Sequence, residues 1–163
     1  MSVEVYVEHK YECSKADRVS LDSVPWLQWF EIWLNNAGED LPQAEIYELS
    51  LLFISDREMT ELNNQYRQKN QPTDVLAFAA LENELVLPPS ELSQSLSLGD
   101  IVISLDTASR QAQERSHSLI EEVTWLATHG LLHLLGWDHP DDQSLHQMLQ
   151  KQEYLRKLVR ITE

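Results

Sequence analysis

The chain has 163 residues, 42% of them hydrophobic, and its 27 acidic and 12 basic side chains give a formal net charge of −15. This length suits a single domain over residues 1–163, and the mixed composition excludes a disordered or repetitive protein. The negative charge excludes a broadly basic surface that grips long nucleic acids through their phosphates, and taken alone it favours a small-molecule or peptide substrate.

The first third of the chain predicts one strand and one helix. Val3, Val5 and Val7 alternate with other residues in the pattern of a half-buried strand. A polar connection through Cys13 then leads to a helix over residues 23–36. Aromatic residues recur in this helix every three or four positions, which is typical of a buried face, although a base-stacking platform is an alternative. These residues are Trp26, Trp29, Phe30 and Trp33.

The next segment predicts a strand, a helix and a second strand. Residues 45–54 are apolar enough for a central strand. Ser55 and Glu58 form the capping-box pattern that opens a helix, which should end near Arg67. A polar loop then leads into a strand over residues 73–78. The expected buried face of the helix contains Met59, Leu62 and Tyr66.

The third segment contains a long irregular stretch. Residues 81–98 are rich in Ser, Glu, Leu and Pro and keep no period, which predicts a surface loop, with a lid over a cleft as an alternative. Residues 99–104 predict the fourth strand. Asp106 is expected to cap a helix that runs to about Arg115.

Two helices complete the predicted fold. Ser118 and Glu121 form a capping box that opens a helix over residues 119–135. From Trp125 to Leu135 this helix is apolar nearly all round, so we expect it to be buried. Asp141 and Asp142 are expected to start a closing helix. Its expected buried residues are Leu145, Met148, Leu149, Leu155, Leu158 and Val159. The elements together predict an α+β fold, with one mixed four-stranded sheet, about five helices packed on it, and helix 119–135 at the centre.

Three histidines near the end of helix 119–135 have the spacing of metal ligands. His129 and His133 are four residues apart, so a helix places them on one face. Gly136 can take the left-handed conformation that ends a helix, and the resulting turn can bring His139 back as a third nitrogen ligand. The pattern predicts one Zn²⁺ per chain with a coordination position open for water, while nickel, copper and iron suit it less well.

The same spacing occurs in metzincin proteases, where a Glu that follows the first His serves as general base. Here that position is Gly130, which has no side chain to accept a proton. The zinc-binding pattern is therefore present without the usual base of the protease mechanism.

Residues 129–139, HGLLHLLGWDH, resemble the signature of the YbeY family of metal-dependent endoribonucleases. Residues 62–78, which include Arg67 and the run PTDVLAF, resemble a second pattern of that family, in which Ser is more common at the position of Ala77. The resemblance implies a hydrolase that cleaves single-stranded ribosomal RNA in 16S rRNA 3′-end maturation and in ribosome quality control. It also places Arg67 in the active cleft.

Two further side chains are candidates for catalysis beside the metal. Arg67 could hold a phosphate through two hydrogen bonds and offset negative charge in the transition state, or it could be a solvated arginine at a helix end. Asp138 could orient a ligand imidazole or position the water, or it could be a turn aspartate. Glu122, seven residues before His129, is a weaker candidate for either role. The remaining histidines lack metal-ligand spacing and are expected to be ordinary surface or core residues: His9, His117 and His146.

Two other functions fit part of the pattern. One is a zinc-dependent peptidase or small-molecule hydrolase with metzincin-like ligand spacing, which would suit the acidic composition. The other is a non-catalytic ribosome-assembly factor with a structural metal. Assays on RNA and on casein would separate the two enzymes.

Location and partners follow from composition and from the resemblance. The single cysteine, Cys13, fits a reducing cytosol, and the chain has neither an apolar run of about 20 residues nor a basic signal-peptide start. We therefore expect a cytoplasmic protein without a membrane partner. The resemblance implies small-subunit ribosomal proteins or an assembly GTPase as partners. An acidic protein would bind RNA through a few local basic residues, through the metal, or with the help of such a partner.

Overall fold

The computed structural model describes residues 2–10, 13–38, 41–80 and 95–160. Its four strands form one sheet in the order β1-β2-β4-β3. Neighbouring strands β1, β2 and β4 run parallel, and β3 is antiparallel to β4, so the sheet is mixed, as predicted. The strand bounds are β1 Ser2–His9, β2 Ile46–Ile54, β3 Val75–Ala79 and β4 Ser95–Ser104.

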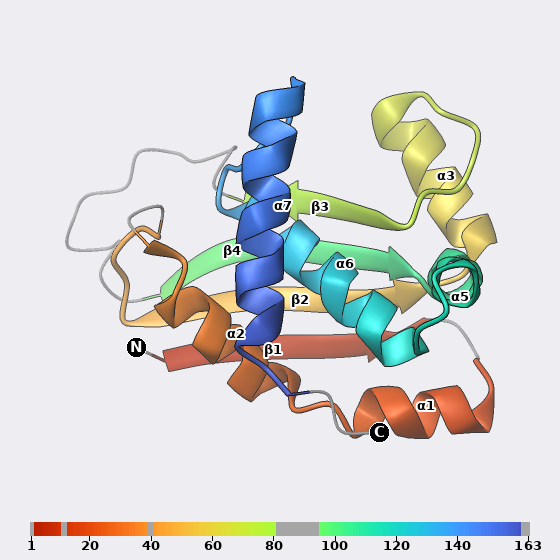
Figure 1. The fold of residues 1–163 in the computed structure, drawn as a ribbon, viewed down its shortest axis with the longest axis horizontal. Helices are drawn as coiled ribbons and strands as arrows, with labels where there is room; N and C mark the ends of the chain where they lie inside the picture. The colour runs from red at the N-terminus through yellow and green to blue at the C-terminus, as the bar shows by residue number, and fades with distance from the viewer. Residues whose placement is uncertain (1, 11–12, 39–40, 81–94, 161–163) are drawn as a thin grey trace.

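Six helices lie in the described part of the chain, against the prediction of about five. Helices α2, α6 and α7 lie over one face of the sheet, and α3 lies beside the start of β3 (Figure 1). This arrangement confirms the predicted α+β fold. No helix in the described residues is both long and apolar enough to cross a membrane. The helix bounds are α1 Lys15–Asp22, α2 Trp26–Asn35, α3 Asp56–Arg67, α5 Leu105–Glu114, α6 Leu119–Leu134 and α7 Asp142–Lys157.

The main core lies between the sheet and the helices α2, α6 and α7. Alternate residues of β2, among them Leu49, Leu51 and Phe53, point into it. The aromatic residues of α2 are buried in the same core, and the Trp33 indole N–H donates to the Leu155 carbonyl of α7 at 3.0 Å. The aromatic stripe is therefore core packing, and its rings are not exposed for base stacking.

Polar contacts fix both ends of α3, the helix that carries Arg67. At its start the Ser55 hydroxyl accepts the Glu58 N–H, as predicted, and Asp56 accepts hydrogen bonds from the hydroxyls of Ser104 and Thr107 at 2.7 and 2.6 Å. These contacts join α3 to the end of β4 and the start of α5. At its other end Gln68 is left-handed, with φ 56°, which stops the helix at Arg67.

Helix α6 approaches the sheet closely through a residue without a side chain. Ser118 caps its start by accepting the Glu121 N–H, as predicted. At Gly130, a Cβ atom would lie only 2.6 Å from Cγ2 of Ile101 on β4. The glycine therefore permits the distance at which α6 packs on the sheet.

The structure corrects three predicted boundaries. Helix α1 occupies part of the segment that the sequence predicted as a polar connection, and Ser14 caps it by accepting the Asp17 N–H. Ser104, rather than Asp106, caps α5, because its hydroxyl accepts the Thr107 N–H. Residues 95–98 belong to β4 and not to the predicted loop 81–98, because parallel pairing with β2 extends the strand. Residues 81–94 lie outside the described part.

Four predicted core residues are instead exposed. Tyr66 is 56% exposed, although its ring meets that of Phe78 edge-on at 5.0 Å. On α7, Met148, Leu155 and the following Val159 are buried, as predicted. Helix α7 packs on α6, and its buried residues are Met148, Gln152 and Leu155, so residues on its other faces are exposed to solvent. The other residues predicted to be buried in this helix and just after it are exposed: Leu145, Leu149 and Leu158.

Candidate metal centre

The last turns of α6 bring two imidazoles together. His129 and His133 are one helical turn apart, and their Nε2 atoms lie 3.0 Å from each other. Two nitrogens about 2.1 Å from one tetrahedral ion would be about 3.4 Å apart, so this separation fits two ligands of the same metal.

The turn after α6 carries the third imidazole. Gly136 is left-handed with φ 96°, its N–H donates to the His133 carbonyl at 3.0 Å, and the Trp137 N–H donates to the Leu132 carbonyl at 2.9 Å. This pair of bonds is a Schellman motif, which ends the helix and reverses the chain. The ring of His139 consequently lies 5.7 Å from that of His129 and 5.4 Å from that of His133, measured between centroids.

The three histidines form a group that can hold a metal ion. One nitrogen from each ring lies within 4.8 Å of the other two. Among the residues that the structure describes, no carboxylate or thiolate belongs to this group. Three imidazole nitrogens are a ligand set that suits zinc and other late transition metals.

Burial favours the neutral form of His129 and His133. Burial lowers the pKa of His133 to about 4, helped by the neighbouring His129 and His139 rings. Burial also lowers the pKa of His129, although the hydrogen bond to Gln152 and the charge of Asp74 oppose this effect. Neutral imidazole is the form that binds metals, so protons compete weakly for the nitrogens of His129 and His133 at neutral pH.

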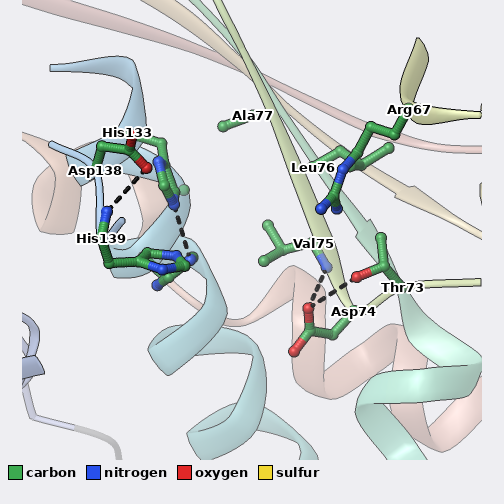
Figure 2. Close-up of a pocket in the computed structure, with 11 residues that line it drawn as sticks. Arg67, Thr73, Asp74, Val75, Leu76, Ala77, His133, Asp138 and His139 are labelled. Atoms are coloured by element: carbon green, nitrogen blue, oxygen red, sulfur yellow. Dashed lines mark hydrogen bonds between the residues drawn. The ribbon is translucent and has the colours of Figure 1, made fainter. Parts of the chain in front are cut away.

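The histidines line one side of a cleft of about 420 Å³. Arg67, at the end of α3, extends its guanidinium into this cleft from the opposite side (Figure 2). Strand β3 forms the wall between them. The residues that line the cleft are Arg67, Thr73, Asp74, Val75, Leu76, Ala77, His129, Gly130, His133, Asp138 and His139.

Asp138 lies at the turn beside the metal group. Its Oδ1 accepts the His139 backbone N–H at 2.8 Å, and its charge raises the pKa of His133 in opposition to the effect of burial. The carboxylate therefore fixes the segment that carries the third histidine and adds negative charge next to the rings.

Two polar residues of the cleft were not among the candidates from sequence. Thr73 and Asp74 lie immediately before β3, and the Asp74 Oδ1 accepts the Val75 N–H at 2.7 Å. Both residues belong to the run PTDVLAF, whose resemblance to the family pattern was the available signal. Gln152, on α7, contacts His129 from outside the cleft. Because it is distant in sequence from the histidine motif, no sequence pattern identified it as part of the site.

Glu122 is held at the other end of α6. It is 0% exposed, and it pairs with Arg115 and with Nε2 of His117 at 2.6 Å. It does not line the cleft that contains His129.

The remaining histidines, His9 and His146, lie away from the cleft and from Glu122. Nε2 of His9 lies 3.2 Å from the carboxylate of Asp22, and His146 is exposed on α7. Neither residue, nor His117, belongs to the group formed by the three metal-ligand candidates.

A match to a known protein family identifies the family of this chain. The family described as Endoribonuclease YbeY matches residues 11–159. The chain belongs to the Endoribonuclease YbeY family. This membership confirms the resemblance found in the sequence and the predicted enzyme class.

Relatives named Endoribonuclease YbeY are similar over nearly the whole chain. A Cyanothece sp. protein is 51% identical over 159 residues, covering 98% of this chain and 94% of the relative. A Picosynechococcus sp. protein is 48% identical over 163 residues, covering 99% and 96%. A Synechocystis sp. protein is 54% identical over 136 residues, covering 83% and 76%.

A solved structure supports the fold. The solution structure of a Thermotoga maritima protein aligns with a TM-score of 0.54 and 22% identity, covering 94% of this chain and 87% of that one. The arrangement of sheet and helices is therefore shared with a known structure.

Proposed function

We propose that this chain is a zinc-dependent endoribonuclease that cleaves single-stranded RNA in the cleft between the three histidines and Arg67. The convergence of His129, His133 and His139 on one side of the cleft, opposite a guanidinium, is the observation that supports this proposal most. Membership in the Endoribonuclease YbeY family supports the choice of RNA as substrate.

In this proposal the three histidines hold the zinc ion through neutral ring nitrogens. The bound ion supplies a Lewis acid for a phosphoryl oxygen and an activated water at neutral pH. The protein supplies the positions: α6 fixes His129 and His133, and the Schellman turn fixes His139. Asp138 acts as a positioning residue through its bond to the His139 backbone.

Arg67 is proposed to bind the scissile phosphate. A planar guanidinium can donate two hydrogen bonds to phosphate oxygens and stabilise negative charge that grows there during cleavage. In the described part of the chain, no acidic side chain forms an ion pair with Arg67, whereas Arg110 and Arg115 are paired with Asp56 and Glu122. The charge of Arg67 is therefore available to a ligand.

A peptidase is the less well supported alternative. A metzincin-like general base at position 130 would need a side chain where even a Cβ would lie 2.6 Å from Ile101. The close packing of α6 on β4 leaves no room for that residue. A structural metal without catalysis is also less well supported, because such sites usually have four protein ligands.

The biological setting is part of the same proposal. We infer a cytoplasmic, single-domain enzyme that acts in 16S rRNA 3′-end maturation and in ribosome quality control. Its partners would be small-subunit ribosomal proteins or an assembly GTPase. With a net charge of −15, the protein gains little non-specific affinity for RNA, so a partner that delivers the substrate suits its composition.

Parallel assays on labelled single-stranded RNA and on casein, each with and without a chelator, test the function. We expect cleavage of RNA that the chelator abolishes and that added zinc restores, and no cleavage of casein. Proteolysis without RNA cleavage would replace the nuclease by the peptidase. A protein that binds zinc but cleaves neither substrate would favour the structural metal.

A further inference from the structure

A buried amide on α7 contacts the metal group from behind. Gln152 is 0% exposed, and its Oε1 lies 3.0 Å from Nδ1 of His129. Its Nε2 donates to the Trp125 carbonyl at 3.3 Å. Both partners lie on α6, one helical turn apart. The amide is thus inserted between two points of the helix that carries the histidines.

These two contacts fix the orientation of the amide. The Trp125 carbonyl can only accept a hydrogen bond, so the NH₂ group of Gln152 must face it. The amide oxygen then faces His129, and because this oxygen can only accept, the hydrogen of the neutral imidazole must be on Nδ1. The other ring nitrogen, Nε2, therefore has a free lone pair.

That lone pair points toward the metal group. Nε2 of His129 is the atom that lies 3.0 Å from Nε2 of His133. A neutral histidine with its hydrogen on Nε2 could not present this atom to a cation. A hydrogen bond on the opposite nitrogen also holds the ring orientation and increases the basicity of the ligand atom.

We propose that Gln152 is a positioning residue that sets the tautomer and the ring orientation of His129, so that Nε2 is presented to the metal before the metal arrives. This inference rests on the metal site of the proposed function. It assigns a role to α7, a helix that contributes no side chain to the lining of the cleft.

Two substitutions separate this role from packing. Gln152→Met keeps a side chain of similar length but removes the acceptor, so we expect zinc affinity to fall about 10- to 100-fold. Gln152→Glu keeps an oxygen that can accept from Nδ1, so its affinity should stay within about threefold of wild type or become tighter. Gln150→Met, at an exposed position on the same helix, is the matched control and should bind zinc like the wild type.

The experiment has two readouts that do not depend on RNA cleavage. Long-range ¹H–¹⁵N NMR of the metal-free protein reports which nitrogen of His129 carries the hydrogen. Competition with a chromophoric chelator reports the zinc affinity of each variant. We expect the Nδ1–H tautomer in the wild type and in Gln152→Glu, and a shift toward Nε2–H in Gln152→Met.

Either of two results would overturn the inference: a wild-type His129 with its hydrogen on Nε2, or a Gln152→Met variant that binds zinc as tightly as the Gln150→Met control. If Gln152→Met does not fold, the tautomer of His129 in the wild type and the zinc affinity of Gln152→Glu still test the inference. Should both readouts agree with the expectation while RNA stays intact, the inference stands and the proposed nuclease function fails.

Discussion

At the scale of single residues, the cleft combines imidazole nitrogens with the guanidinium of Arg67. The pKa of His133 is lowered because its ring is half-buried beside two other imidazoles. Arg67 contributes a positively charged guanidinium from across the cleft. A site built in this way offers ligands for a cation on one side and a partner for a phosphate on the other.

Replacing Arg67 by Ala tests its role in catalysis. We expect kcat for RNA cleavage to fall about 100-fold, since one donor to the transition-state charge is lost, while bound zinc stays at wild-type level. Arg57→Ala, at the exposed start of the same helix, is the matched control and should retain wild-type kcat. Steady-state kinetics and metal analysis of both variants provide the measurement. Equal activity in the two variants would remove Arg67 from the mechanism.

The lowered pKa of His133 predicts how the metal-free protein responds to acid. The unfolded chain takes up a proton on this residue near its ordinary pKa of 6.5, whereas the folded protein does so only at about 4. Protons therefore favour the unfolded state in this window, and the stability that is present above pH 6.5 is lost progressively as the pH falls toward 4. Because the ring is partly exposed, the loss should be about 1–2 kcal/mol.

Urea unfolding of chelator-treated protein at several pH values measures this loss. In His133→Asn the fall in the free energy of unfolding should be smaller than in the wild type. His146→Asn, which changes an exposed histidine on α7, should behave like the wild type. An equal fall in His133→Asn and the wild type would contradict the assigned environment of His133.

At the scale of elements, the end of α3, the end of α6 and the start of β3 meet at the cleft. Helix α3 ends at Arg67 because Gln68 turns left-handed, and Asn63 ties the following loop by donating to the Gln71 carbonyl at 2.8 Å. Helix α6 ends in the Schellman turn at Gly136. Strand β3 begins between these two ends, and its residues Val75, Leu76 and Ala77 line the cleft.

Replacing Gly136 by Ala tests the turn that carries His139. A Cβ at this position would meet no atom within 4 Å, so the cost comes from the backbone at φ 96°. We expect a loss of about 1 kcal/mol in stability. We also expect weaker zinc binding, because relief of the strain moves His139 away from the other two rings.

Gly38→Ala is the matched control for this turn. Gly38 also has a positive φ, 89°, and open space around it, but it follows α2. It should lose similar stability and keep the zinc affinity of the wild type. Unchanged zinc affinity in Gly136→Ala would show that the turn does not position the third ligand.

At the scale of the whole molecule, the architecture could be predicted from the sequence more fully than the residues that surround the site. Alternation and capping patterns are local, so they indicated the mixed sheet and the ends of α3 and α6. The approach of Gln152 to His129 joins residues 23 positions apart on two helices, and it depends on tertiary packing that no local pattern contains. For the same reason, the exposure of Tyr66 and Leu149 could not be predicted from spacing alone.

The overall charge leads to a prediction about RNA binding. Of the described residues that line the cleft, Arg67 is the one with a positively charged side chain, so one or two phosphate contacts are expected. The affinity for single-stranded RNA should then fall only about three- to sevenfold as salt rises from about 50 to about 200 mM. Fluorescence anisotropy with zinc-free protein measures this slope. A fall of about 1000-fold would reveal a broad basic contact surface that the net charge of −15 argues against.

Stepwise addition of zinc to chelator-stripped protein, with cleavage of labelled single-stranded RNA followed at each step, tests whether cleavage requires one zinc ion held by the three histidines. We predict no cleavage without metal, a rise in rate that stops at one equivalent of zinc per chain, and no rise at all in His129→Ala, His133→Ala or His139→Ala. Cleavage by the stripped protein at the full rate, or a zinc-dependent rate that survives loss of any one of these histidines, would contradict this requirement.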